Sequence, residues 1–173
     1  MKKVIVLSIH GLGDNRIEKH IKRLLWEGYH VKYVNASEGN IEELFTHEKL
    51  ELVHIPIPYI KKSGIHILQI YKKMIFELKK DFGDIVHIHD PQLLVLSKIA
   101  TRLGYKVVYD RHERYEVIPI LTARLGAFFE QKYAKWISGV VYVNPAQTAY
   151  VEKVYRCASV MIPNYQSEKI FTE

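Results

Sequence analysis

Histidine and carboxylate side chains are concentrated between residues 86 and 116, in types and spacings that can do chemistry. They form two groups, the first of His87, His89 and Asp90 and the second of Asp110, His112 and Glu113. Imidazole and carboxylate groups are ligands of zinc and iron, so a metal site is one interpretation. The second group could instead supply a general base and an orienting carboxylate. In a third interpretation, both groups are the polar ends of two strands that meet at a pocket.

A further candidate for chemistry is the glycine-containing turn HGLGDNR, which leads from an apolar run into a helical pattern. Its candidate binding residues are Gly11, Gly13, Asp14, Asn15 and Arg16. Backbone N–H groups at the start of a helix favour an anion. A nicotinamide site is disfavoured, because Arg16 stands where the dinucleotide fingerprint needs its third glycine and the second expected strand ends in Asn35 rather than an acid. A tight turn without a ligand is the alternative, although Arg16 opposes the helix dipole and could itself face an anion.

The elements that would position these groups alternate between short apolar runs and longer helical patterns. Strands are expected at residues 3–9, 31–35, 50–57, 84–89, 106–109, 140–143 and 159–162. Helices are expected at residues 15–28, 65–80, 91–103, 118–136 and 145–155. This alternation predicts right-handed βαβ units, and therefore an α/β fold with a Rossmann-like parallel sheet of about seven strands and helices on both faces.

A parallel sheet brings the carboxyl ends of its strands to one edge, where open α/β folds bind ligands. Polar residues are expected at this edge at positions 10–14, 89–90 and 110–113 and at Asn144. His87 shares a strand face with His89 but is expected to be an interior residue, hydrogen-bonded under a helix. The metal interpretation is weakened because no histidine follows His112. Covalent hydrolase chemistry is not expected, because the chain has no G-x-S-x-G turn.

The composition is typical of one folded domain: 173 residues, 48% hydrophobic and 25% charged. The net charge of +6 favours anionic partners such as sugar nucleotides or anionic lipid, and no nucleic-acid-binding motif is present. The single cysteine, Cys157, excludes an internal disulfide and is interpreted as a small buried hydrophobe. The apolar run at residues 4–9 is too short for a signal peptide or a membrane span, so a cytoplasmic protein is expected.

Nearly the whole chain resembles the N-terminal half of retaining glycosyltransferases of the GT-B type (glycosyl transferases group 1, family 4-like). The resemblance is strongest at residues 84–91 (DIVHIHDP), 107–113 (VVYDRHE) and 162–171 (IPNYQSEKIF). The resemblance implies an N-terminal Rossmann-like acceptor-binding domain over residues 1–162, the start of an interdomain hinge at residues 163–173, and an absent C-terminal donor domain. Tyr165 departs from the pattern, because the family hinge usually has glycine there. Since the family binds its donor mainly through the C-terminal domain, the chain alone is expected to be inactive.

The resemblance also implies roles for individual residues. His112 matches the family histidine beside the reacting sugar carbon, which implies a catalytic role in transition-state stabilisation, while the donor phosphate takes the acceptor proton. Acceptor or donor-phosphate binding is implied for Gly11, Gly13, Asp14, Asn15, Arg16, His89, Asp90, Asp110 and Glu113. The donor substrate would be a nucleotide-diphosphate sugar, and neither a cofactor nor a metal is expected.

The acceptor implied by the resemblance is a glycan or a lipid-linked molecule, in the synthesis of a cell-surface polysaccharide or glycolipid. Family members often attach to the inner face of the membrane through a basic amphipathic helix, and the lysine-rich segment 61–80 could do so. A solvated helix face is the alternative for these lysines. For the whole chain, the alternatives are a non-catalytic Rossmann-like binding module and a metal-dependent hydrolase that uses the histidine and aspartate groups.

Overall fold

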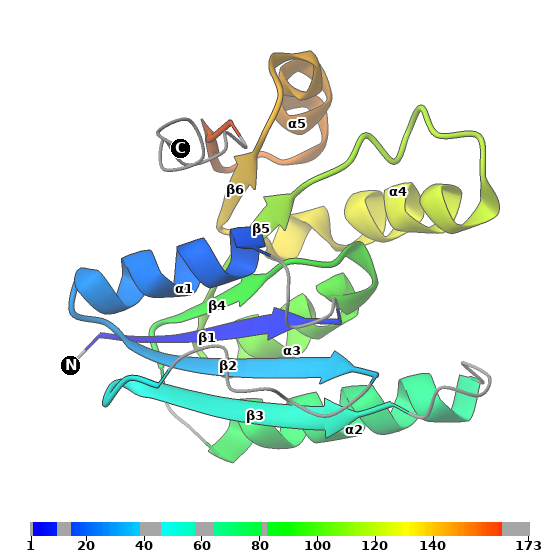
Figure 1. Ribbon diagram of the computed structural model, residues 1–173. Helices are drawn as coiled ribbons and strands as arrows, with labels where there is room; N and C mark the ends of the chain where they lie inside the picture. The colour runs from blue at the N-terminus through cyan, green and yellow to red at the C-terminus, as the bar shows by residue number, and fades with distance from the viewer. Residues whose placement is uncertain (1, 10–14, 39–45, 58–63, 81–82, 164–173) are drawn as a thin grey trace, which may run out of the picture.

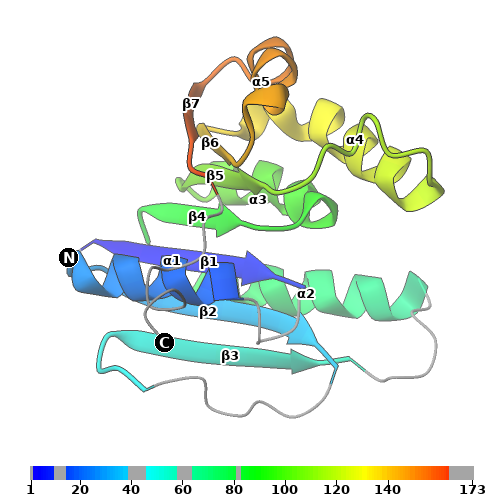
Figure 2. The ribbon, with the colours of Figure 1, turned by 45° about the horizontal axis from the view of Figure 1, so that its top comes forward.

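Seven parallel strands form one sheet in the order β3-β2-β1-β4-β5-β6-β7 (Figures 1 and 2). The structure is a computed structural model that describes residues 2–9, 15–38, 46–57, 64–80 and 83–163. The strands are β1 (Lys3–Ser8), β2 (His30–Ser37), β3 (Leu50–Pro56), β4 (Ile85–Ile88), β5 (Lys106–Arg111), β6 (Gly139–Tyr142) and β7 (Ala158–Met161). The sheet confirms the Rossmann-like architecture expected from the sequence.

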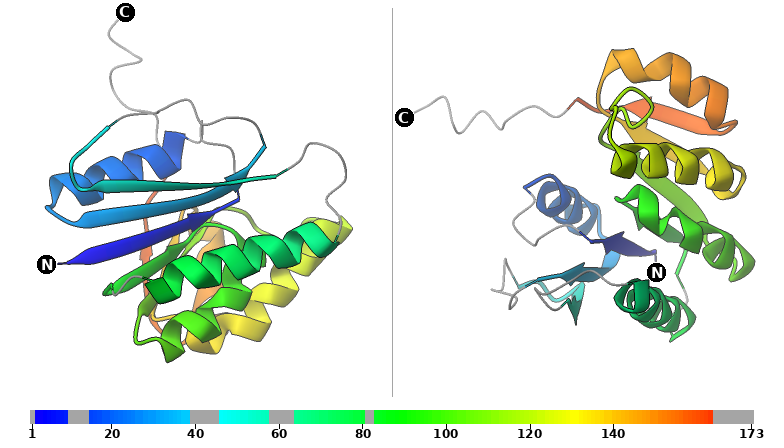
Figure 3. Two further views of the ribbon diagram at one scale, coloured as in Figure 1. Left: turned by 90° about the horizontal axis from the view of Figure 1, so that it is seen from below. Right: turned by 90° about the vertical axis from the view of Figure 1, so that its right-hand side faces the viewer.

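Helices cover both faces of this sheet, but unequally. They are α1 (Asn15–Trp26), α2 (Gly64–Lys80), α3 (Ser97–Arg102), α4 (Leu121–Tyr133) and α5 (Thr148–Val154), with 3₁₀ turns η1 (Pro91–Leu96), η2 (Ala134–Trp136) and η3 (Pro145–Gln147). In the right-hand view of Figure 3, α1 lies on one face of the sheet and α2 to α5 lie on the other. Within the described segments, no helix is both long and apolar enough to cross a bilayer.

The strand order reverses at the centre of the sheet, between β1 and β4. The chain runs outward from β1 through β2 to β3, then returns to the other side of β1 and continues from β4 to β7. Leu7 near the end of β1 pairs with Ile88 at the end of β4, and Ile88 pairs with Tyr109 of β5. In open α/β sheets this reversal leaves a crevice beyond the carboxyl ends of the strands, which is where ligands bind.

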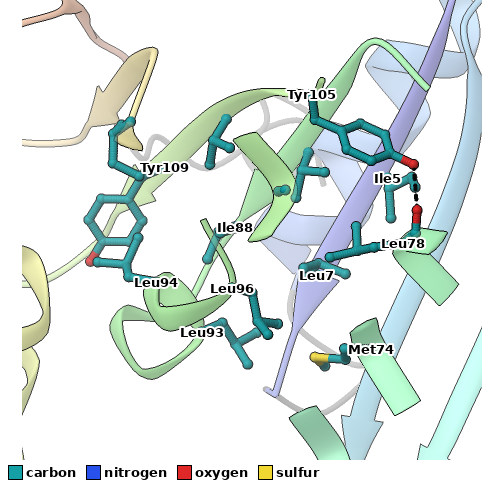
Figure 4. Packing of buried hydrophobic residues seen from close by; sticks show 14 of the residues in the cluster. Ile5, Leu7, Met74, Leu78, Ile88, Leu93, Leu94, Leu96, Tyr105 and Tyr109 are labelled. Carbon is teal, nitrogen blue, oxygen red and sulfur yellow. Dashed lines mark hydrogen bonds between the residues drawn. The ribbon is translucent and has the colours of Figure 1, made fainter. Parts of the chain in front are cut away.

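Apolar side chains on the two faces of β1 build two cores. Val4 and Val6 point toward α1, where they pack with Ile17 and Ile21, among others. Ile5 points to the opposite face and joins the larger core beneath the other helices (Figure 4). Both faces are apolar because a parallel strand is covered on both sides, and each fully buried side chain of this size stabilises the fold by about 1.5–3 kcal/mol.

Tyr105 and Cys157 lie at the margins of the larger core. The Tyr105 hydroxyl donates to the backbone oxygen of Leu78 over 2.8 Å (Figure 4), which ties the start of β5 to the end of α2. Cys157 packs half-buried against the same core, as a small hydrophobe would, and burial raises the pKa of its thiol.

Some element boundaries differ from those expected. The helix expected at residues 91–103 is divided into η1 and α3, and the helix expected from residue 118 begins only at Leu121. Pro119 explains the second difference, because the residue before a proline avoids the helical conformation, and Ile120 is also extended. β5 continues past Tyr109 to Arg111, since Asp110 and Arg111 still pair with β6.

Candidate active site

The site is centred on Asp110, at the carboxyl end of β5. Asp110 is 3% exposed, and its Oδ2 lies 3.4 Å from Nδ1 of His89. Its Oδ1 lies 3.3 Å from Nδ1 of His112 and 3.9 Å from Nη1 of Arg16. One carboxylate therefore joins the ends of β4 and β5 to the first turn of α1, and it brings together four of the residues predicted from the sequence.

His112 is the first residue beyond β5, and its ring is placed by contacts on two sides. It lies 5.5 Å from the His89 ring, centroid to centroid, in a stacked arrangement, and its Nδ1 faces Asp110. Its backbone oxygen accepts a hydrogen bond from Nε2 of Gln147 over 3.4 Å. A carboxylate at Nδ1 favours a proton on that nitrogen and leaves Nε2 as the atom that can act on a ligand.

Asp90 joins the two strands at which the strand order reverses. It is 1% exposed, and its Oδ2 accepts a hydrogen bond of 2.8 Å from the backbone nitrogen of Ile9. The backbone nitrogen of His89 donates to the oxygen of Leu7 over 3.1 Å. Asp90 thus holds the end of β1 beside the end of β4, which is a positional function in addition to the binding function predicted for it.

Arg111 was expected at the ligand edge together with its neighbours at positions 110–113, and this prediction is wrong. Its side chain is fully buried on the opposite face of the sheet, with Nε 2.8 Å from Oε1 of the equally buried Glu130. The guanidinium also pairs with Glu116 and lies 4.4 Å from the centre of the Tyr150 ring. Side chains alternate along a strand, so Asp110 and Arg111 must point to opposite faces.

The ionisation of this buried pair reflects opposing effects. Burial lowers the pKa of Arg111, but the nearby Glu130 charge and hydrogen bond outweigh it, so the pKa is raised overall. Burial raises the pKa of Glu130, and Arg111 offsets only part of that rise. The pair anchors α4 behind the end of β5 and so supports the backbone that carries His112.

His20 on α1 belongs to the site and was not predicted from the sequence. Its ring lies 4.1 Å from that of His87 and 5.6 Å from that of His89, centroid to centroid. Burial lowers the pKa of His20 to about 4, and it lowers the pKa of His87 well below the usual value. The sequence did contain one indication that His20 belongs to the site. His20 lies four positions after Arg16, and residues four apart share one face of a helix.

His87 is interior, as expected, at 4% exposed beneath α1. The hydrogen bond expected with this placement is not found at Nε2, which has no partner among the described residues. His87 and His89 stack at 4.7 Å with an angle of 17° between the rings. Alternate residues of a strand face the same way, so both imidazoles point toward α1.

A hollow of about 480 Å³ opens between α1 and the face of the sheet formed by β4, β5 and β6. We call it the α1 hollow. Its α1 wall is basic, with Arg16, Lys19 and Arg23, and its polar end is formed by His20, His87 and Asp110. Its sheet side is apolar and includes Ile85, Val108, Val141 and Val143. The combination suits an anionic ligand with an apolar part.

The structure describes only some of the remaining predicted site residues. Gly11, Gly13 and Asp14 lie outside the described residues, as does all of the expected hinge after Pro163. Asn15 begins α1, and its side chain is likewise outside the description. Glu113 is exposed. Asn144, expected at the ligand edge, accepts a hydrogen bond from the backbone nitrogen of Ala146 over 2.8 Å and so caps η3.

Comparison with solved structures supports the fold. Sucrose-phosphate synthase from Thermosynechococcus elongatus has a TM-score of 0.70 at 14% identity, over 98% of this chain and 50% of that chain. UGT2 from Phytolacca americana, in its apo form, has a TM-score of 0.68 at 9% identity, over 99% of this chain and 54% of that chain. UGT89C1 from Arabidopsis thaliana, solved with UDP, has a TM-score of 0.67 at 13% identity, over 96% and 53% respectively. The chain thus spans about half the length of these proteins, and identities this low show a shared fold alone.

Comparison of sequences identifies the family. No curated protein sequence matches the chain. The profile of Glycosyltransferase Family 4, however, matches residues 15–165, which include every described element from α1 to β7. The chain therefore belongs to Glycosyltransferase Family 4 and carries a Rossmann-like domain of the GT-B type.

Proposed function

We propose that this chain is the acceptor-side domain of a retaining glycosyltransferase that uses a nucleotide-diphosphate sugar. The observation that carries the proposal is the contact of one buried carboxylate, Asp110, with His89, His112 and Arg16, one strand away from the point where the strand order reverses. That position is the ligand crevice of an open α/β sheet. Membership of Glycosyltransferase Family 4 supports the reaction class.

His112 is the proposed catalytic residue. Glycosyl transfer passes through a sugar cation, so groups that stabilise positive charge at the sugar accelerate it. Asp110 would orient the His112 ring, so that the unprotonated Nε2 of a neutral imidazole faces the positive charge that develops on the sugar. The donor phosphate itself would take the acceptor proton, so neither a base from the protein nor a metal cofactor is needed for transfer.

The proposed binding residues serve two different ligand groups, the donor phosphate and the acceptor. Arg16 lies in the first turn of α1, where its guanidinium and the helix N-terminus can both meet a phosphate. His89, Asp90 and Glu113 would contribute to the acceptor side, and the glycine turn would approach both the donor phosphate and the acceptor. Solved neighbours include UGT89C1 with UDP and with UDP-L-rhamnose, which supports a nucleotide-sugar donor here.

The proposed acceptor is a glycan or a lipid-linked molecule of the cell surface, reached at the inner face of a membrane. Support comes from α2, where Leu68 and Phe76 are 60% and 63% exposed beside the exposed pairs Lys72–Lys73 and Lys79–Lys80. Exposed apolar and basic side chains on one helix suit an anionic membrane surface. Ile70 and Tyr71, by contrast, pack inward.

The test uses the full-length protein, including the donor-binding domain expected after residue 173, with a panel of nucleotide-diphosphate sugars. We expect release of nucleoside diphosphate with one of them, and retention of the anomeric configuration in the product. His112→Ala should lower turnover by about 100-fold or more with little change in melting temperature. His47→Ala, a change at an exposed position before β3, is the control. Unchanged turnover in His112→Ala would remove the catalytic assignment, and no turnover with any donor would reject the function.

A further inference from the structure

Three imidazoles and one carboxylate meet between α1 and the ends of β4 and β5. One ligand atom each from His20, His87, His89 and Asp110 lies within 4.8 Å of all the others. We call this the histidine–aspartate cluster. We propose that it binds one divalent transition-metal ion of the zinc class. The proposal does not depend on the proposed glycosyl transfer, which needs no metal.

The donor set matches what zinc prefers. Zinc takes imidazole nitrogen and carboxylate oxygen at about 2.0–2.2 Å in a tetrahedron, which puts neighbouring ligand atoms about 3.3 Å apart. The cluster spans up to 4.8 Å, so side-chain rotation must bring its members inward on binding. The ligands come from one helix and two neighbouring strands, and such a framework fixes their directions better than a loop does.

His87 offers a ligand atom that the described residues leave unused. Nε2 of His87 is buried, and no described residue offers it a hydrogen bond. Buried polar atoms are nearly always satisfied, and a bound ion would satisfy this one.

The ion can reach the cluster through a hollow, but it must compete with a guanidinium group for the Asp110 carboxylate. The route is the α1 hollow, which is lined by His20, His87 and Asp110. The competitor is Arg16, whose guanidinium lies 3.9 Å from the Asp110 carboxylate and must give way. Because the wall of the hollow is basic, binding has to come from strong nitrogen ligation. This excludes Mg²⁺ and Ca²⁺, which prefer oxygen ligands, and favours Zn²⁺.

Direct titration of the purified chain, first stripped with a chelator, tests the proposal. Calorimetry with Zn²⁺ should give saturable binding of one ion per chain, and Mg²⁺ under the same conditions should give none. Co²⁺ should give the intense visible absorption of a four-coordinate ion rather than the faint colour of a six-coordinate one. The absence of one-to-one binding, or a six-coordinate cobalt spectrum, would overturn the proposal without bearing on glycosyl transfer.

Matched variants assign the ligands. His20→Gln and Asp110→Asn should each weaken Zn²⁺ binding by at least about tenfold, while His47→Gln, outside the cluster, should leave it unchanged. Circular dichroism would establish that each variant is folded. Equal affinity in His20→Gln and the parent chain would show that the ion binds elsewhere and would reject the site. The cobalt spectrum of the parent chain remains decisive if either variant fails to fold.

Discussion

Oδ1 of Asp110 lies 3.3 Å from Nδ1 of His112, so the end of β5 and the residue that follows it supply the carboxylate and the proposed catalytic imidazole that it orients. Arg111, the last residue of β5, stands between the two and points into the core. The proposed catalytic pair is therefore positioned by the end of the strand.

Replacing the carboxylate tests its effect on His112. Asp110→Asn keeps the size of the side chain but removes the negative charge that faces Nδ1 of His112 and holds its proton there. We expect turnover of the full-length enzyme to fall by about 100-fold, with a smaller change in KM. Glu48→Gln removes an exposed carboxylate before β3 and serves as the control. Equal turnover in both variants would mean that Asp110 does not act through His112.

Removing only one partner of the buried Arg111–Glu130 pair should lower the free energy of unfolding by a large amount. Arg111→Met leaves Glu130 as an uncompensated buried carboxylate, which should cost about 3–5 kcal/mol in the free energy of unfolding. Urea denaturation measures this. The double variant Arg111→Met/Glu130→Met should recover much of the loss, because both buried charges are gone. Arg124→Met, at an exposed position of α4, should change stability by less than about 0.5 kcal/mol. A double variant as unstable as Arg111→Met would contradict this interpretation.

The buried histidines predict that acid destabilises the metal-free protein. Burial lowers the pKa of His20 to about 4, from 6.5 when unfolded. As pH falls below 6.5 the unfolded chain therefore takes up the proton first, and stability declines until pH reaches about 4. For His20 alone the loss is at most about 3 kcal/mol.

Urea denaturation at a series of pH values, with a chelator present, checks this prediction. His20→Gln should flatten the decline between pH 6.5 and 4. His47→Gln, which removes an exposed histidine, should leave the slope unchanged. The same slope in both variants would show that other groups cause the acid sensitivity.

The basic surface of α2 predicts salt-sensitive binding to anionic membranes. Each lysine near an anionic surface contributes about 1 kcal/mol, so Lys72→Gln/Lys73→Gln should weaken binding by about 30-fold. Flotation with phosphatidylserine-containing vesicles measures it, and neutral vesicles should recover little protein. Lys106→Gln/Lys153→Gln changes the net charge equally at exposed positions of β5 and α5 and is the control. Equal recovery of both double variants would show that only net charge matters.

Local patterns in the sequence were enough to determine the sheet and the edge at which His89, Asp110 and His112 meet. Short β-branched runs between helical patterns predict parallel βαβ units, because a strand covered on both faces is apolar on both. Carboxyl ends of parallel strands share one edge, so the closeness of His89, Asp110 and His112 followed from their positions after two strands. The strict alternation of side chains would also have separated Arg111 from its neighbours.

Only the tertiary structure decided which distant residues complete the site. His20 joins His87 and His89 because α1 packs across the carboxyl half of the sheet, and Glu130 reaches Arg111 because α4 packs behind β5. Both pairings depend on how far a helix is shifted and rotated over the sheet. That placement results from the packing of many side chains, and no short stretch of sequence encodes it.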